Sequence, residues 1–334
     1  MNVIEKCPLK SRNTFGIEAS ADLLMEFESE EELRECLSRS VSPVFTIGGG
    51  SNLLFLNDYH GTLLHSLIKG IEPVCETDEC VFVKVGSGVV WDDFVEYSVR
   101  QGWWGTENLT AIPGEVGAGA VQNIGAYGTE IKDIIHEVEA ISVPEGMKRT
   151  FAREECMYGY RDSIFKNELK GRYVVTYVTF RLQKHAVPNL EYGTLKESVN
   201  AGGGATLENI RRAVKQIRDS KLPDPHVTGN AGSFFMNPVI SDREFQILKR
   251  NYPDIPSYGF DGGLFKVPAG WLIERCGWKG RALGPAAVHD RQALVLVNRG
   301  GATGADVKAL ADTIISDVKE KFGITLRTEV NYIS

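Results

Sequence analysis

Hydrophobic residues recur every three or four positions in three parts of the chain, which is the spacing of one buried face of an α-helix. The apolar positions are Trp91, Phe94, Val95 and Val99 in the first part, Leu207, Ile210, Val214 and Ile217 in the second, and a series from Val307 to Phe322 in the third. Thr206 and Thr303 can cap the last two helices, and Gly323 is a stop signal. A fourth, shorter helix is predicted through Leu37, because Ser29-Glu30-Glu31-Glu32 is a capping box.

Segments that alternate apolar and polar residues, or that are rich in β-branched residues, predict strands. These segments are Val44–Ile47, Val81–Val85, Glu137–Val143, Tyr173–Leu182 and Ile324–Ile333. Because the helices are interspersed irregularly among runs of strands, and not in a regular βαβ succession, we expect an α+β fold. The sequence Leu222-Pro223-Asp224-Pro225 prevents the preceding helix from continuing, and we expect a domain boundary near it.

Two glycine-rich segments stand out from this pattern. The strand Val44–Ile47 runs directly into Gly48-Gly49-Gly50-Ser51-Asn52, and the segment from Ile112 to Gly128 holds five glycines. The second segment is too rich in glycine for a stable helix and its side chains are too small for a good strand, so we predict a loop. Both segments lack the third glycine of the dinucleotide fingerprint G-x-G-x-x-G, and the chain has no P-loop sequence.

Glycine turns leave two interpretations open. They are tight structural turns, or their consecutive backbone N–H groups form an anion-binding nest that needs no lysine. If both segments bind, an extended phosphate-bearing ligand such as a dinucleotide cofactor suits them better than a single phosphate.

Composition and charge exclude several classes of protein. The 334 residues correspond to roughly two domains, with three small ones possible. With 43% hydrophobic and 24% charged residues, the chain has the composition of ordinary globular proteins. The 37 basic and 44 acidic residues give a net charge of −7, which argues against nucleic acid or an anionic membrane as a partner. We expect a cytoplasmic protein, because charged residues interrupt the place of a signal peptide and no segment suits a membrane span.

Six cysteines are scattered without a Cys-x-x-Cys motif, so we expect reduced and mostly buried thiols, with neither a disulfide nor a zinc site. His226 and His289 lack a second nearby ligand, so we treat both as structural and predict no metal.

Three residues outside the glycine segments can carry chemistry. Arg161 forms either a surface pair with Asp162 or a two-donor clamp for a carboxylate. Ser233 stands in a turn that lacks the nucleophile elbow, so it either caps that turn or delivers a proton to a strongly basic atom. Glu329 either pairs with Arg327 on an exposed face or, if that face is buried, stays protonated and acts as an acid.

Taken together, the segments resemble the UDP-N-acetylenolpyruvoylglucosamine reductases, flavoenzymes that complete UDP-N-acetylmuramate for bacterial peptidoglycan. The likeness covers nearly the whole chain. Its motifs are Asn13-Thr14-Phe15-Gly16, Gly48 to Asn52, Ile112-Pro113-Gly114, Gln122 to Gly128, Tyr160 to Ser163, Lys221-Leu222-Pro223, Gly229 to Phe235, Asn237-Pro238, Ala269 to Ile273, Val288-His289, Gln292-Ala293-Leu294 and Thr328-Glu329-Val330.

The resemblance implies a two-part FAD-binding domain of the vanillyl-alcohol-oxidase type and a C-terminal α+β domain for the substrate. The implied divisions are residues 1–69 for the first FAD-binding subdomain, 70–221 with 323–334 for the second, and 222–322 for the substrate domain. Three positions depart from many members of the family: Ala120 and Thr328 replace proline, and Met236 replaces lysine. None of them removes a reacting group.

The resemblance also implies roles for particular residues. Arg161, Ser233 and Glu329 match the catalytic positions. The FAD-binding positions are Gly48, Gly49, Gly50, Ser51, Asn52, Pro113, Gly114, Gly117, Asn123, Gly125, Ala126 and Tyr127. The substrate-binding positions are Tyr160, Lys221, Asn237, Gln292 and Tyr192, the last being the lid tyrosine of the subgroup with an extra loop.

The implied reaction passes hydride from NADPH to FAD and then to the enolpyruvyl ether of the UDP-sugar, with Ser233 protonating the adjacent carbon. Its partners are these small molecules, and we expect a monomer. Two alternatives stay open: a flavin oxidase of the same fold that reduces oxygen, and a UDP-sugar binder without turnover.

Overall fold

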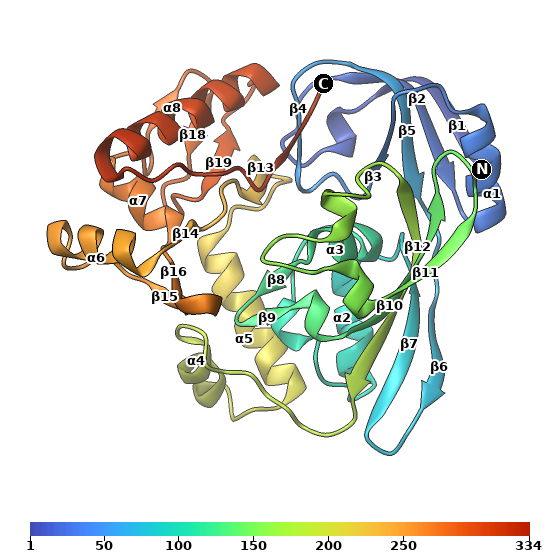
Figure 1. Ribbon diagram of the computed structural model, residues 1–334, viewed down its shortest axis with the longest axis horizontal. Helices are drawn as coiled ribbons and strands as arrows, with labels where there is room; N and C mark the ends of the chain where they lie inside the picture. Colours follow the sequence, from blue (N-terminus) through green and yellow to red (C-terminus); the bar gives the residue numbers. More distant parts are fainter. The chain divides into compact units, whose positions relative to one another are not determined.

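The computed structural model describes all 334 residues, which form two compact units. The first unit consists of Met1–Cys7, Ala21–Gly49 and His60–Ser220. The second consists of Pro8–Ser20, Gly50–Tyr59 and Lys221–Ser334. The chain therefore passes from the first unit to the second within the first glycine-rich segment. Figure 1 traces these segments by colour along the sequence.

One sheet of the first unit carries the first glycine-rich segment. Its strand order is β1 (Asn2–Pro8), β2 (Ser20–Phe27), β5 (Tyr59–Ser66) and β3 (Val44–Ile47). Helix α1 (Glu30–Arg39) lies between β2 and β3 in sequence, and its cap is the predicted one, since Ser29 accepts a hydrogen bond from the Glu32 amide at 3.1 Å. Strands β3 and β5 are parallel, and their register sets Ile47 opposite His65.

The second sheet of this unit is antiparallel. Its strand order is β11 (Lys148–Ala152), β10 (Ile135–Ser142), β12 (Tyr173–Gln183), β7 (Cys80–Gly86) and β6 (Ile71–Glu76). Helix α2 (Trp91–Arg100) packs on it through fully buried rings, with the Phe94 and Phe180 centroids 4.7 Å apart. This contact confirms the helix predicted from the spacing of Trp91, Phe94, Val95 and Val99.

Further strands and helices belong to this part of the chain. They are α3 (Val116–Gln122), β8 (Gly125–Ala126), β9 (Thr129–Glu130), α4 (Leu195–Ala201) and α5 (Leu207–Lys221). Helices α4 and α5 share one apolar cluster, in which the predicted core positions Leu207, Ile210 and Val214 are buried.

The second unit is built on small sheets. One has the order β13 (Gly229–Ser233), β19 (Val295–Asn298), β18 (Ala286–Val288) and β17 (Ala282–Leu283); another has the order β14 (Val239–Ile240), β16 (Leu264–Lys266) and β15 (Tyr258–Phe260). Strand β20 (Asn331–Ile333) pairs in parallel with β4 (Leu53–Phe55). The helices are α6 (Asp242–Asn251), α7 (Ala269–Arg275) and α8 (Gly304–Phe322). Short 3₁₀ turns in the chain are Lys10–Arg12, Glu107–Leu109, Ile131–Asp133, Arg153–Cys156, Ile164–Lys166 and Asp261–Gly263.

The predicted α+β fold and the predicted helices are confirmed, but two segment predictions were wrong. Helix α3 interrupts the segment that we expected to be entirely loop. A Cβ on Gly117 would lie 2.7 Å from the Ser87 Cβ, so close packing decides its conformation and outweighs the low helix propensity of glycine. The final strand is confined to Asn331–Ile333, because Ile324 to Val330 makes only an isolated bridge, at Thr328.

None of the helices combines the length and the apolar character that crossing a bilayer requires.

Candidate active site

The two glycine-rich segments meet in the first unit. A Cβ on Gly48 would lie 3.1 Å from the Ala118 Cβ and 3.2 Å from Glu115 Oε2. A Cβ on Gly49 would lie 3.5 Å from the Gly114 Cα. We call this meeting point, formed by Gly48, Gly49, Gly114, Glu115 and Ala118, the glycine junction. Because side chains on Gly48 and Gly49 would press against these residues, glycine at both positions allows the two segments to lie side by side.

Two backbone amides at the start of α3 form hydrogen bonds with the preceding part of the chain. The Val116 amide donates to the Val89 carbonyl and the Gly117 amide donates to the Ser87 carbonyl, each at 2.9 Å. These two amides are therefore engaged within the protein. The missing side chain of Gly117 instead allows α3 to lie close to Ser87.

The left-handed turn after α3 is fixed by Asn123. Asn123 is buried with a φ of 48°, and its side-chain amide donates to the Gly159 carbonyl at 2.7 Å. Its Oδ1 accepts from the Lys132 amide at 3.1 Å. These contacts give Asn123 a structural task in shaping the loop that we predicted to bind the cofactor.

Arg161 lies against the same loop. Its Nη2 donates to the Gly125 carbonyl at 2.7 Å, and its own carbonyl accepts from Lys166 Nζ at 2.7 Å. Asp162 Oδ1 accepts from the Ser163 amide at 3.0 Å and from Asn167 Nδ2 at 2.8 Å. Arg161 therefore lies next to Gly125, in the loop that we predicted to bind the cofactor.

Tyr127 and Tyr192 meet edge to face, with ring centroids 5.9 Å apart. The loops that carry them are joined by Asn108, whose Nδ2 donates to the carbonyls of Tyr127 and Asn189 at 2.8 Å each. Burial raises the pKa of the Tyr127 hydroxyl, and the attraction of Arg218 opposes this effect. The predicted lid tyrosine therefore lies beside the predicted cofactor loop.

Sequence analysis missed Arg218. Its Nε donates to the Ala111 carbonyl at 3.2 Å, next to the second glycine-rich segment. Burial lowers the pKa of its guanidinium, while the charge of nearby Tyr127 acts in the opposite direction and that of Arg161 adds to the lowering. A signal did exist, because Arg218 follows Val214 by four residues and so continues the buried face of α5.

The second unit places Ser233 and Glu329 on neighbouring segments. Ser233 ends β13, and the amide of the next residue, Phe234, donates to the Leu294 carbonyl at 2.8 Å. The Glu329 amide donates back to the Phe234 carbonyl at 2.8 Å. Asn52 Nδ2 donates to the Glu329 carbonyl at 3.2 Å. The two residues predicted to be catalytic in this unit, Ser233 and Glu329, therefore lie on segments that a backbone hydrogen bond joins.

Asn237 and Gln292 both border the start of α7. Asn237 Oδ1 accepts from the Ala269 amide at 2.9 Å, and Gln292 Oε1 would lie 3.3 Å from a Cβ on Gly270. These two predicted substrate positions are therefore brought together within the second unit.

The predicted site residues divide between the two units. The first unit holds Gly48, Gly49, Pro113, Gly114, Gly117, Asn123, Gly125, Ala126, Tyr127, Tyr160, Arg161 and Tyr192. The second unit holds Gly50, Ser51, Asn52, Lys221, Ser233, Asn237, Gln292 and Glu329.

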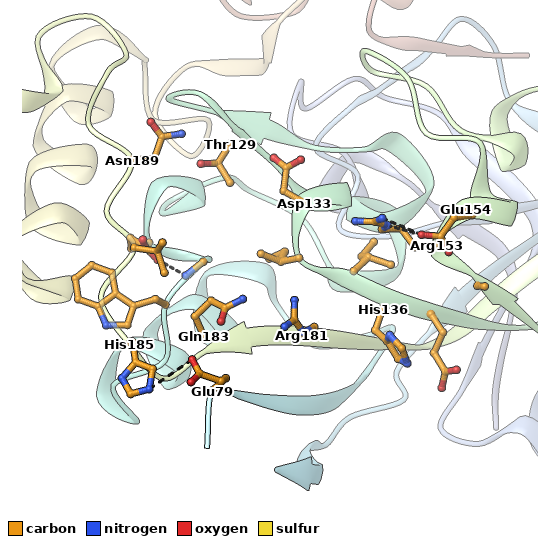
Figure 2. A pocket seen from close by; sticks show the side chains of 18 of the residues that line it. Glu79, Thr129, Asp133, His136, Arg153, Glu154, Arg181, Gln183, His185 and Asn189 are labelled. Atoms are coloured by element: carbon orange, nitrogen blue, oxygen red, sulfur yellow. Dashed lines mark hydrogen bonds and ion pairs between the residues drawn. The ribbon is translucent and has the colours of Figure 1, made fainter. Parts of the chain in front are cut away.

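A separate hollow in the first unit is lined mainly by charged and polar side chains (Figure 2). His185 Nε2 lies 3.7 Å from Glu79 Oε2, and Arg153 Nη2 lies 2.8 Å from Glu154 Oε1. At least half of each of these side chains is exposed, so water screens the two ion pairs. Each pair joins a basic and an acidic residue, so neither charge predominates there. No group of three or more His, Cys, Asp or Glu side chains anywhere in the chain could hold a metal ion.

Two family models match different parts of the chain. The family model of an FAD binding domain matches residues 21–151, which include the glycine junction. The model described as the C-terminal domain of UDP-N-acetylenolpyruvoylglucosamine reductase matches residues 224–333, which include Ser233 and Glu329. The fold and the site therefore define an FAD-binding oxidoreductase with a separate C-terminal domain.

Relatives extend over the whole chain. A UDP-N-acetylenolpyruvoylglucosamine reductase of Bacteroides fragilis is 55% identical over 98% of this chain and 99% of its own length. One of Porphyromonas gingivalis is 48% identical over 100% of both. The chain belongs to the UDP-N-acetylenolpyruvoylglucosamine reductase family. The solved reductase of Thermus caldophilus has the same fold, with a TM-score of 0.69 at 23% identity over 100% of this chain and 98% of that one.

Proposed function

We propose that this protein reduces the enolpyruvyl group of UDP-N-acetylglucosamine enolpyruvate to give UDP-N-acetylmuramate, with NADPH as the electron donor. The observation that carries the proposal is the hydrogen-bonded pairing of the Ser233 and Glu329 segments, at 2.8 Å between the Glu329 amide and the Phe234 carbonyl. Membership of the family supports the choice of substrate, because the relatives bear the name of this reductase.

FAD, when bound, supplies hydride transfer between NADPH and the terminal enolpyruvyl carbon. The glycine junction supports cofactor binding, because Gly48 and Gly49 let the first predicted cofactor segment lie directly against Gly114, Glu115 and Ala118 of the second. We propose that Ser51, Asn52, Pro113, Ala126 and Tyr127 join these glycines in holding the cofactor.

Three residues of the chain then act on the substrate. Addition of hydride to the terminal carbon leaves negative charge on the neighbouring carbon and its carboxylate. Arg161 and a protonated Glu329 stabilise this enolate, because a guanidinium and a carboxyl O–H both donate to the oxygens on which charge develops. Ser233 gives its proton to the carbon, which is far more basic than a hydroxyl.

The substrate is proposed to contact Tyr160, Lys221, Asn237 and Gln292, with Tyr192 as a lid from the extra loop. The Tyr127–Tyr192 ring contact at 5.9 Å is the contact that supports a lid role for this loop. A lid that excludes water protects reduced cofactor from wasteful oxidation.

We further propose that residues 1–69, 70–221 with 323–334, and 222–322 act as the two FAD-binding subdomains and the substrate domain. We propose that the protein acts as a monomer in the cytoplasm.

The replacement Ser233→Ala tests the assignment of the proton donor. We expect the variant to be reduced by NADPH at the normal rate, and then to be reoxidised by the enolpyruvyl substrate roughly 10²–10⁴-fold more slowly. Stopped-flow absorbance of the flavin measures the two half-reactions separately. Ser316→Ala, at an exposed position of α8, is the matched control and should behave as wild type.

Normal turnover of Ser233→Ala would refute the role of the hydroxyl. Rapid reoxidation of the wild-type protein by oxygen with peroxide release would favour the flavin oxidase instead. A colourless protein that binds the UDP-sugar without turnover would favour the binding protein.

A further inference from the structure

Three titratable side chains form a buried chain beneath the glycine junction. His65 Nδ1 lies 3.2 Å from Glu26 Oε1, and His65 Nε2 lies 3.0 Å from Glu115 Oε1. The side chains of His65, Glu26 and Glu115 are only 11%, 9% and 11% exposed. The reaction proposed above uses none of them.

The geometry determines how many protons the three groups share. Each ring nitrogen of His65 faces a carboxylate oxygen, and neither an imidazole nitrogen without hydrogen nor a carboxylate can donate. Two hydrogen bonds therefore require two protons among the three groups, either on a doubly protonated ring between two carboxylates or on a neutral ring beside one carboxylic acid. The raised pKa of His65 favours the doubly protonated ring. Burial works against this charge, but hydrogen bonding and attraction from Glu115, followed by those from Glu26, raise the pKa of His65 above its usual value.

The local fold explains why these groups meet. The parallel register of β3 and β5 sets His65 opposite Ile47, directly before Gly48. Glu115 is the residue before α3, yet its side chain does not cap that helix and turns to His65 instead. Glu26 is held from its other oxygen by Asn2 Nδ2 at 2.9 Å.

Glu115 connects this chain to the cofactor-binding backbone. Its Oε2 lies 3.2 Å from the position of a Cβ on Gly48, so the carboxylate is packed against the first glycine turn. The preceding residue, Gly114, lies against Gly49. A displacement of Glu115 would therefore disturb both sides of the glycine junction.

We propose that His65 is a positioning residue, which by bridging Glu26 and Glu115 holds the glycine junction in the form that binds FAD. FAD binding then depends on the two protons that His65, Glu26 and Glu115 share. This inference rests on the FAD-binding part of the proposed function and is independent of the roles of Ser233, Arg161 and Glu329.

The direction of the pH effect follows from the loss of a proton. The charged groups that act on the His65 ring are Glu115 and Glu26. When pH rises above the raised pKa, one ring nitrogen presents a lone pair to a carboxylate oxygen and the two repel. Glu26 belongs to β2 and is fixed by Asn2, so Glu115 is the group that moves. FAD affinity is therefore highest where the three groups share two protons, and it falls as pH rises above the raised pKa of His65.

Two substitutions separate this role from simple packing. His65→Gln can donate to only one of the two carboxylates, and should weaken FAD binding about tenfold at pH 6.5, as expected for losing one charge-assisted hydrogen bond. Glu115→Gln presents an amide N–H to Nε2, so a neutral ring then satisfies both contacts. Whatever its affinity at pH 6.5, this second variant should lose most of the decline in FAD affinity that the wild-type protein shows between pH 6.5 and pH 9.

The measurement is titration of the full-length apoprotein with FAD from pH 6 to pH 9, followed by quenching of flavin fluorescence. His60→Gln is the matched control, since His60 is 79% exposed and lies 3.3 Å from Asp22. NMR of ¹⁵N-labelled histidine should show that His65 keeps both ring protons above pH 6.5, the ordinary pKa of a histidine side chain.

If His65→Gln and Glu115→Gln keep the wild-type affinity and the wild-type pH dependence, the inference is wrong while the proposed function stands. A neutral His65 ring at pH 6.5 also overturns it. If His65→Gln does not fold, Glu115→Gln and the NMR titration decide the question. Failure of the wild-type protein itself to bind FAD would overturn the proposed function as well.

Discussion

At the scale of the residue, the candidate site is marked by strained backbone. Ala111, Asn123, Tyr127 and Arg161 all have a positive φ, between 48° and 57°, although none of them is glycine. This conformation costs a residue with a Cβ about 1–2 kcal/mol. The hydrogen bonds of Asn123 and of Arg161 with neighbouring loops offset that cost. Strain that the surroundings hold in place at several neighbouring loops is typical of a preorganised binding site.

Gly50 combines a left-handed backbone with a very close approach to another backbone segment. It has a φ of 67°, and a Cβ there would lie 2.0 Å from the Arg12 carbonyl oxygen. We expect Gly50→Ala to destabilise the protein by about 1–3 kcal/mol more than Gly277→Ala, because backbone has to move to relieve the clash. Gly277 has a φ of 79° and open space around it, so it reports the cost of the conformation alone. Urea denaturation measures both variants, and equal losses would mean that the loop adapts freely.

At the scale of the elements, an ion-pair network around the buried Glu139 joins three strands and a helix of the first unit. Glu139 of β10 contacts Lys84 of β7 at 2.5 Å and Lys148 of β11 at 2.6 Å, and Lys148 reaches Glu30 of α1 at 2.9 Å. Burial raises the pKa of the Glu139 carboxyl, but the hydrogen bonds and charges of the two lysines outweigh it and leave the pKa below its usual 4.5. The network therefore stabilises the folded state when Glu139 is ionised.

This network gives stability a pH dependence of known sign. A carboxyl with a lowered pKa in the folded state contributes stability above about pH 4.5, and the contribution is lost as pH falls through the folded-state value. We expect Glu139→Gln to cost about 1–3 kcal/mol at pH 7, and the difference from wild type to shrink below pH 4.5. Urea denaturation at several pH values measures this. Glu76→Gln, at an exposed pair with Lys184, is the control, and an equal effect there would argue against the network.

The elements differ in how far their sequence predicts them. Helices α2 and α8 are predicted correctly because each has a continuous apolar face and a clear start or stop, such as Gly323 with a φ of 73°. Helix α3 could not be predicted, because its stability comes from contact with Ser87, a residue distant in sequence. The candidate site shows the same limit. Motifs identify the two glycine-rich segments, but the contacts of His65 with Glu26 and Glu115 depend on strand register and on where α3 begins.

At the scale of the whole molecule, the division into two units has a consequence for cofactor removal. Most residues proposed to hold FAD belong to the first unit, as does the bridge through His65, whereas Ser51 and Asn52 belong to the second. A ligand that binds only the folded state stabilises it by about 2.7 kcal/mol at a free concentration one hundred times its Kd. We therefore expect FAD to increase the protection of backbone amides from hydrogen exchange more in the first unit than in the second. The contrast should be clearest between the buried segments around Val214 of α5 and Leu310 of α8.

Hydrogen exchange followed by mass spectrometry, with and without FAD, resolves the two units peptide by peptide. Under conditions where exchange occurs through unfolding of a unit, peptides of α2, β12 and α5 should slow on addition of FAD, because opening them requires loss of the ligand. Peptides of α6 and α8 should slow less. Equal slowing of exchange in all of these elements would mean that the two units unfold together as one cooperative block. FAD bound at the glycine junction would then stabilise residues of both units equally.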